Sequence, residues 1–155
     1  MAELPTFESV RSTMYREKKK QQPSLPKNMA EINLGRLYTE TLDKRDFLLF
    51  DVYISAGRIL CFFAQELHFH FAEVVEVFID VTFLWCPSLF YQLVTISSVK
   101  EGVSFNIAYF LLPGKSREVY MAAFPNFKAA FHALRALLSI NVVRTDFELA
   151  LIKAF

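Results

Sequence analysis

Apolar residues from position 46 onward fall into short runs of strand length that are separated by turn residues. Five of these runs are rich in β-branched and aromatic residues, and they cover residues 47–52, 58–63, 77–83, 91–99 and 103–111. A Ser-Ala-Gly turn ending at Gly57 separates the first two runs, and a Lys-Glu-Gly turn ending at Gly102 separates the last two. We therefore expect two antiparallel hairpins.

The chain ahead of these runs predicts one helix and a polar linker. Apolar side chains at helical spacing in residues 7–20 indicate a short amphipathic helix. Pro23 and Pro26 end it, because proline cannot continue a helix and forces the preceding residue into extended backbone. We accordingly divide the chain into an amino-terminal helix and linker, residues 1–45, and a folded part, residues 46–155.

Further elements follow the five runs. Residues 116–138 carry apolar side chains at helical intervals, which predicts a helix that Pro125 is expected to kink or split. Residues 140–143 predict another buried strand, and a last helix is expected to begin at Thr145.

From residue 77 the predicted order is strand, strand, strand, helix, strand, helix. A helical crossover that returns the chain to the same sheet places the fourth strand parallel to the first. Three antiparallel strands, a crossover helix and a fourth parallel strand make up the front half of a ribonuclease-H-like fold. The order of elements alone leaves this fold as one candidate among several. The expected class is α/β, with a partial fold of this type and a helical amino-terminal extension.

Composition sets a limit on the size of the core and raises a question about its cover. The chain has 155 residues, of which 54% are hydrophobic and 17 are phenylalanine. One domain at most fits this length, and the phenylalanine content is high for a domain of this size. Either the core is unusually aromatic or part of its cover is missing. In the second case the uncovered apolar surface is a candidate for self-association.

Charge is divided unevenly along the chain. The net charge of +1 gives no overall field that would attract nucleic acid or an anionic membrane. Residues 1–45 nevertheless carry a net charge of +3, and residues 46–155 carry −2. The first part contains a basic cluster made of Arg16, Lys18, Lys19 and Lys20. Contact with a polyanion is expected to begin there, with a solvated helix face as the alternative.

Cysteine usage and hydropathy indicate an intracellular protein without a membrane partner. Cys61 and Cys86 lie far apart, and residues 1–6 lack the charged and apolar regions of a signal peptide. The longest uncharged stretch, residues 81–99, contains Pro87 and several polar residues. Buried strands explain that stretch better than a transmembrane helix does.

Two acids, Asp80 and Asp146, lie in or just after apolar runs. Burying an isolated carboxylate is costly, so each is expected to be paired, hydrogen-bonded, protonated or bound to a cation. If the first and fourth strands of the predicted fold are neighbours, the two carboxylates can share a metal ion. Oxygen ligands suit Mg²⁺ or Mn²⁺, which in a phosphoryl-transfer site activates a water or a 3′-hydroxyl. Such a site normally needs a third acid.

Each acid also has a structural explanation. Asp80 can be a strand-end acid bonded to nearby amides. Thr145 and Glu148 fit a capping box at the start of the last helix, where Asp146 would also favour the positive end of the helix dipole.

Three other side chains can contact nucleic acid. Lys115 follows a Pro-Gly turn and can approach a phosphate, with simple solvation as the alternative. Trp85 and Tyr91 can stack on bases, with packing in a core or an interface as the alternative.

Five blocks of sequence carry a resemblance to a known family. They are an amino-terminal block at 5–12 that continues at 22–27, Phe-Ile-Asp-Val-Thr-Phe at 78–83, Pro-Ser-Leu-Phe-Tyr-Gln-Leu-Val-Thr-Ile at 87–96, Tyr-Phe-Leu-Leu-Pro-Gly-Lys-Ser at 109–116 with Tyr120, and Thr-Asp-Phe-Glu at 145–148. Their order and spacing resemble the transposases of Mutator-like elements (MULE), in particular the animal type associated with FLYWCH zinc fingers. The resemblance spans essentially the whole chain.

The resemblance implies a DDE-type transposase, which cuts and joins the DNA of transposon ends in the nucleus with Mg²⁺ or Mn²⁺ as cofactor. Asp80 and Asp146 match the family's first two catalytic, metal-binding acids. Arg16, the run Lys18 to Lys20, and Lys115 are the candidate contacts to DNA.

Two departures from the family pattern bear on activity. Val81 replaces the usual small residue after the first acid, and the chain ends before the family's third acid, a glutamate. We therefore expect a transposon-derived protein that is catalytically incomplete, unless a complete enzyme extends beyond Phe155. The alternative is a domesticated, non-catalytic DNA- or protein-binding module that uses the basic amino-terminal helix.

Overall fold

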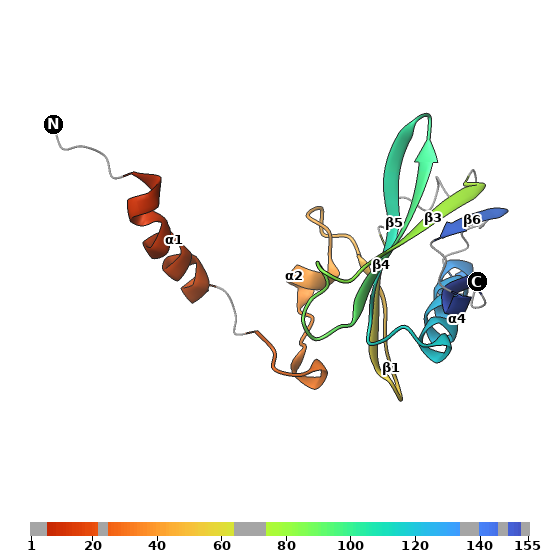
Figure 1. Cartoon of the computed structure of the whole chain (residues 1–155), viewed down its shortest axis with the longest axis horizontal. Helices are drawn as coiled ribbons and strands as arrows, with labels where there is room; N and C mark the ends of the chain where they lie inside the picture. The colour runs from red at the N-terminus through yellow and green to blue at the C-terminus, as the bar shows by residue number, and fades with distance from the viewer. Residues whose placement is uncertain (1–5, 22–24, 64–73, 134–139, 146–148, 153–155) are drawn as a thin grey trace.

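The structure is a computed structural model that describes residues 6–21, 25–63, 74–133, 140–145 and 149–152. Within this part of the chain, six strands form one mixed sheet in the order β1-β2-β5-β4-β3-β6 (Figure 1). The strands are β1 (Leu48–Ile54), β2 (Gly57–Phe63), β3 (Glu76–Thr82), β4 (Gln92–Lys100), β5 (Val103–Leu112) and β6 (Val142–Thr145). The helices are α1 (Phe7–Gln21), the 3₁₀ helix η1 (Met29–Glu31), α2 (Arg36–Thr39), α4 (Arg117–Ala133) and α5 (Leu149–Ile152). The predicted α/β class is confirmed.

Both predicted hairpins are confirmed, since β1 pairs antiparallel with β2 and β4 pairs antiparallel with β5. The β4–β5 turn has positive φ at Glu101 (53°) and Gly102 (78°). This two-residue geometry matches the twist of the flanking strands, which explains why the turn forms at these residues. β2 also pairs antiparallel with β5, so the first hairpin extends the sheet beyond the second.

The predicted parallel pairing of the first and fourth strands is confirmed. β6 runs parallel to β3, from Glu76 opposite Val142 to Ile79 opposite Thr145. α4 lies between β5 and β6 in the sequence and therefore belongs to the crossover that returns the chain to the sheet. The three antiparallel strands β5, β4 and β3 are thus followed in space by one parallel strand.

The last strand differs from the prediction in its bounds and its burial. It covers Val142–Thr145 instead of residues 140–143, and it forms an edge of the described sheet. Val142 and Val143 are 41% and 36% exposed. An apolar run shows that a segment suits a sheet, but it does not distinguish a central strand from an edge strand.

α4 is one continuous helix that includes Pro125, so the helix is not split as expected. Proline supplies no amide hydrogen to the preceding turn. Near this interruption, the Asn126 side-chain amide donates to the Ala122 carbonyl oxygen at 2.7 Å. The packing of the apolar face against the core keeps the helix intact through Pro125.

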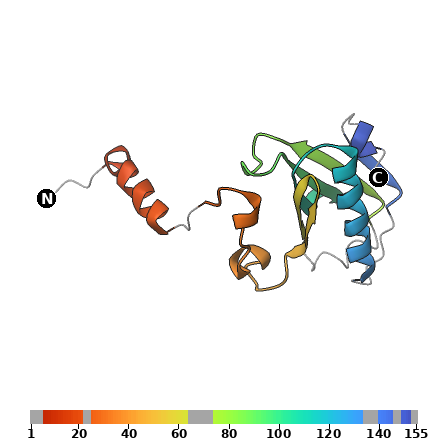
Figure 2. The same ribbon diagram turned by 90° about the horizontal axis from the view of Figure 1, so that it is seen from below.

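The core between α4 and the sheet is strongly aromatic, and Figure 2 shows α4 lying along one face of the sheet. Six aromatic side chains are buried there, namely Phe63, Phe110, Tyr120, Phe124, Phe127 and Phe131. The ring centroids of Phe127 and Phe131 are 4.6 Å apart, and those of Phe63 and Phe131 are 4.7 Å apart. Among the described phenylalanines only Phe7 and Phe83 are exposed. Five of the described phenylalanines thus build an aromatic core on this face.

The segment that carries η1 and α2 lies on the other side of the β1–β2 hairpin from α4 (Figure 2). Phe47 ends this segment, with its ring centroid 5.4 Å from that of Phe62 and 6.3 Å from that of Tyr109. Inside the predicted linker, the Met29 carbonyl oxygen accepts a hydrogen bond from the Tyr53 hydroxyl of β1 at 3.4 Å, so part of that linker is packed against the sheet as well.

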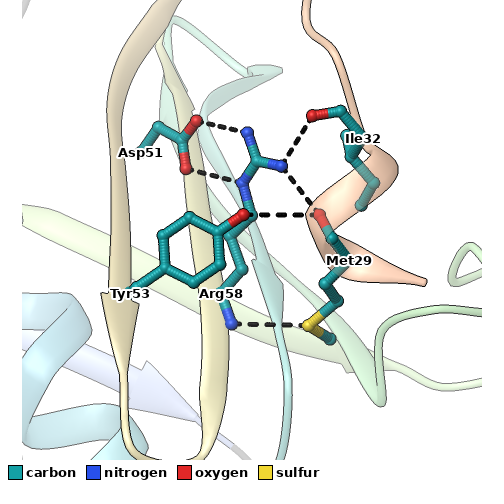
Figure 3. Close-up of polar contacts among 5 residues, drawn as sticks. All are labelled: Met29, Ile32, Asp51, Tyr53 and Arg58. Atoms are coloured by element: carbon teal, nitrogen blue, oxygen red, sulfur yellow. Dashed lines mark hydrogen bonds and ion pairs between the residues drawn. The ribbon is translucent and has the colours of Figure 1, made fainter.

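Arg58 fixes this segment to the hairpin, as Figure 3 shows. Its buried guanidinium donates from Nε and Nη2 to the two carboxylate oxygens of Asp51, at 2.8 and 2.5 Å. Nη1 donates to the carbonyl oxygens of Met29 and Ile32, at 3.0 and 2.7 Å. The hydrogen bond to Asp51 is the main cause that raises the pKa of Arg58 above its usual value. The guanidinium thus joins both strands of the hairpin to the incoming chain.

α1 confirms the predicted amino-terminal helix, but it lies apart from the sheet in both views (Figures 1 and 2). Its described side chains are exposed, except for Val10, which is half-buried. The apolar side of the predicted amphipathic helix, including Phe7 and Met14, therefore contributes nothing to the described core.

Candidate functional site

Asp80, the first candidate acid, lies on the face of β3 opposite α4. Val77 and Ile79 belong to the buried core, and alternation along the strand directs Asp80 to the other face. Its carboxylate is exposed and accepts a hydrogen bond from the Thr82 hydroxyl at 3.1 Å. Thr95 of β4 is its partner in the antiparallel register. Asp80 is therefore hydrogen-bonded, which is one of the states expected for it, but it is exposed because this face of the strand is open to solvent.

Val81 does not crowd the Asp80 carboxylate. It pairs with Val94 in β4 and packs against the hydrophobic core, which lies on the opposite face. The β-branched side chain at this position is typical of a strand. The valine side chain at position 81 thus lies on the α4 side of the sheet, not on the side that carries the acid.

Asp146, the second candidate acid, lies outside the described residues, as does Glu148 of the predicted capping box. The described part of β6 ends at Thr145, which is paired with Ile79. Ile79 directly precedes Asp80, and Thr145 directly precedes Asp146 in the sequence. The described ladder therefore ends at the residue before each acid.

The Thr145 hydroxyl oxygen is buried and has no hydrogen-bond partner among the described residues. A buried hydroxyl normally has a partner, since leaving it unpaired costs about 1–3 kcal/mol. The capping role expected for Thr145 would supply such a partner from the residues that follow it.

No group of three or more His, Cys, Asp or Glu side chains able to hold a metal ion occurs in the part of the chain that the structure describes. Of the predicted pair, Asp80 alone is described, and it offers one carboxylate beside the Thr82 hydroxyl. These oxygen donors suit Mg²⁺ or Mn²⁺ in kind. A dedicated site needs further ligands, so the described residues fit only one part of it.

A buried polar link joins two of the sequence blocks to α4, at the end of the sheet nearest the start of that helix. The fully buried Gln92 donates from Nε2 to the Gly114 carbonyl oxygen and to the Tyr120 hydroxyl, each at 2.9 Å. Gln92 stands in phase with Val94 and Ile96, which are buried apolar residues of the same strand. A glutamine on the buried side of a strand pattern is the sequence signal for such a link.

Lys115 lies near this link, exposed at the loop between β5 and α4. Its Nζ is 6.0 Å from the ring centroid of Tyr91, which precedes β4. The Phe83 ring meets the Tyr91 ring edge to face, with centroids 5.6 Å apart. Trp85, in the same β3–β4 loop, is 80% exposed. The structure therefore places Lys115 and Tyr91 together, and neither Tyr91 nor Trp85 is buried in the described core.

The other basic candidates lie on α1 and are not brought to Asp80. Arg16, Lys18, Lys19 and Lys20 are exposed on the last part of that helix. Lys20 forms an ion pair with Glu17 at 2.7 Å. The three lysines lie in the last turn of α1, where their positive charge stabilises the negative end of the helix dipole, so they have a structural role as well.

Both cysteines are free thiols. Burial raises the pKa of Cys61 well above its usual value, and it also raises the pKa of Cys86. A thiol that stays protonated is a poor nucleophile, so neither side chain has the character of a reactive centre.

Comparisons with protein-family models, curated proteins and solved structures give no match. Of the helices in the described ranges, none is long and apolar enough to cross a bilayer.

Proposed function

We propose that residues 46–155 form the amino-terminal half of a DDE-type transposase domain of the Mutator-like kind, with a partial ribonuclease-H-like fold. The pairing of the strands supports this proposal. β3, β4 and β5 are consecutive antiparallel strands, α4 follows, and β6 returns parallel to β3. This is the arrangement of the front half of that fold.

The observation that carries the proposal is the position at which the parallel ladder ends. Its last pair, Ile79 with Thr145, stands directly before the two acids in the sequence. The first two metal-binding acids of the family are Asp80 and Asp146 in this proposal, and they follow the same rung of the ladder. A ligand pair drawn from adjacent parallel strands is a suitable basis for a shared cation.

In this proposal Asp80 acts as a metal ligand whose carboxylate is preorganised by a hydrogen bond. The Thr82 hydroxyl donates to Oδ2 and restricts the carboxylate, while the exposed side chain stays accessible to an ion and to a DNA phosphate. Mg²⁺ or Mn²⁺ would supply activation of a water or a 3′-hydroxyl and would stabilise the leaving oxygen. Val81 leaves this approach free because it packs on the other face.

Residues 1–155 match two of the family's three acids, so we propose that they do not cleave DNA by themselves. A plasmid-nicking assay with Mg²⁺ or Mn²⁺ tests this, and no nicking above a protein-free control is expected. Metal-dependent nicking that disappears in Asp80→Ala would contradict the proposal, because these residues would then hold a complete catalytic site.

A second candidate function is a domesticated, non-catalytic DNA-binding module. The exposed basic end of α1 favours it, since this helix stands apart from the sheet and is open to a partner (Figure 1). Affinity for duplex DNA should then fall steeply with salt and should be lost when Arg16 and Lys18 to Lys20 are replaced by glutamine. Absence of binding at low salt would remove this candidate.

A further inference from the structure

The loop between β3 and β4 exposes a group of large apolar side chains. Phe83 is 50% exposed, Leu84 is 84% exposed and Trp85 is 80% exposed. The loop begins directly after Thr82, whose hydroxyl holds the Asp80 carboxylate. Large apolar side chains exposed next to one another are unusual on a protein surface and typically mark a contact with a partner.

The loop has a defined backbone, which distinguishes it from an unstructured tip. The Cys86 amide donates to the Phe83 carbonyl oxygen at 3.3 Å, and the Phe90 amide donates to the Pro87 carbonyl oxygen at 2.8 Å. Phe90 is buried and anchors the second turn in the protein. The exposed aromatic groups therefore stand on a folded base.

A cation lies beside the aromatic group. Lys115 is positioned over the Tyr91 ring, and the Phe83 ring contacts the same tyrosine. The loop that carries Lys115 is fixed to β4, because Gln92 donates to the Gly114 carbonyl oxygen. The cation and the rings thus come from two loops that the buried link holds together.

We propose that the surface formed by Phe83, Leu84, Trp85, Tyr91 and Lys115, the loop surface, binds unpaired nucleotides of single-stranded DNA. A nucleobase stacks on an exposed indole or phenol ring, and its phosphate is attracted by a lysine. Aromatic side chains are also enriched in protein interfaces, but the cores of those interfaces are depleted in lysine, so the cation over the Tyr91 ring favours a nucleotide. This binding needs neither Asp80 nor a metal ion. It therefore goes beyond the proposed relation to a DNA-cleaving transposase and can be tested separately from it.

The chain contains one tryptophan, so its fluorescence reports on Trp85 alone. We expect an oligothymidylate of about 12 nucleotides to quench this emission in EDTA at low salt. A duplex of similar length should quench it far less, because its bases are already stacked. In an anisotropy titration with a labelled oligonucleotide, Trp85→Ala should bind about 5-fold to 140-fold more weakly.

Matched variants separate stacking from other effects. Trp85→Phe keeps an aromatic face and should retain most of the affinity. Lys115→Gln should lower the slope of log affinity against log salt by about 0.7. Leu42→Ala removes a fully exposed apolar side chain elsewhere and should bind as the parent does. An unchanged thermal midpoint checks that each variant is folded.

Equal affinity of Trp85→Ala and the parent would overturn the inference, as would the absence of any binding at low salt. Trp85 emission that changes with protein concentration in the absence of DNA would assign the loop surface to a second copy of the chain instead, and would also overturn it. Because the titration contains EDTA, its failure says nothing about metal binding at Asp80, and failure of metal binding leaves this result unaffected.

Discussion

The Arg58 guanidinium and the Asp51 carboxylate form a bidentate ion pair across the β1–β2 hairpin, with Nε 2.8 Å from Oδ1 and Nη2 2.5 Å from Oδ2 (Figure 3). The Arg58 side chain is only 7% exposed, and the Asp51 side chain is 28% exposed. The remaining guanidinium donor reaches two backbone carbonyl oxygens of the preceding segment. One side chain therefore fixes both the hairpin and the chain that enters it.

Removal of the Arg58 side chain should destabilise the fold markedly. Arg58→Ala leaves a partly buried carboxylate and two carbonyl groups without the donor they have now, so we expect a loss of about 3 kcal/mol in the free energy of unfolding. Denaturant titration measures this loss. Arg58→Lys keeps the charge but not the planar fork, and it should recover only part of the stability.

The exposed ion pair between Arg144 and Glu76 is the matched control. Its Arg144→Ala variant should lose no more than about 1 kcal/mol, because water already solvates both groups. Equal losses for the two arginine variants would contradict the role given to Arg58.

Gly57 should tolerate no side chain. Its φ is +134°, and a Cβ built there would lie 2.8 Å from the Cβ of Pro113. Gly57→Ala combines an unfavourable backbone angle with this overlap, so it should cost roughly 1–3 kcal/mol. A Cβ at Gly35 would have nothing within 4 Å, so Gly35→Ala should change the stability by less than about 0.5 kcal/mol. A shift in the unfolding midpoint for both variants, or for neither, would refute this distinction.

Cys61 should make stability depend on alkaline pH. Burial raises the pKa of its thiol, so above the ordinary thiol pKa of about 8.5 the unfolded chain releases a proton that the folded chain keeps. The unfolded state then binds fewer protons, and the free energy of unfolding should fall by up to about 1.4 kcal/mol per pH unit from this group.

Cys61→Val removes the titrating thiol and provides the reference for this effect. Denaturant titrations between about pH 7 and pH 10 should show a shallower alkaline decline in the variant than in the parent, because other groups titrate equally in both. Parallel curves would show that Cys61 is accessible to ionisation in the folded state.

Local signals in the sequence were sufficient to predict most of the sheet. Turn residues such as Gly102 and the strand-length apolar runs indicate the hairpins. The strand-helix-strand order indicates the parallel pair β3 and β6, because a helical crossover returns the chain to the same sheet in the same direction. These features depend on neighbouring residues or on general rules of connection, so one sequence is enough to reveal them.

Other features depend on contacts between distant residues, and the sequence did not indicate them. The docking of Met29 and Ile32 on Arg58 joins segments more than twenty residues apart. The exposure of Asp80 depends on which face of β3 the rest of the chain covers. Trp85 and Tyr91 could equally have been core residues, because an aromatic side chain does not indicate whether a loop buries it.

Mn²⁺ binding followed by electron paramagnetic resonance tests the central claim most directly, namely that Asp80 and Asp146 share a divalent cation. The account predicts that Asp80→Asn and Asp146→Asn each weaken Mn²⁺ binding by at least roughly tenfold, and that the double variant is hardly weaker than either single one. Glu101→Gln, at the exposed β4–β5 turn, should bind as the parent does. Mn²⁺ affinity that is the same in the parent and in Asp80→Asn would contradict the account.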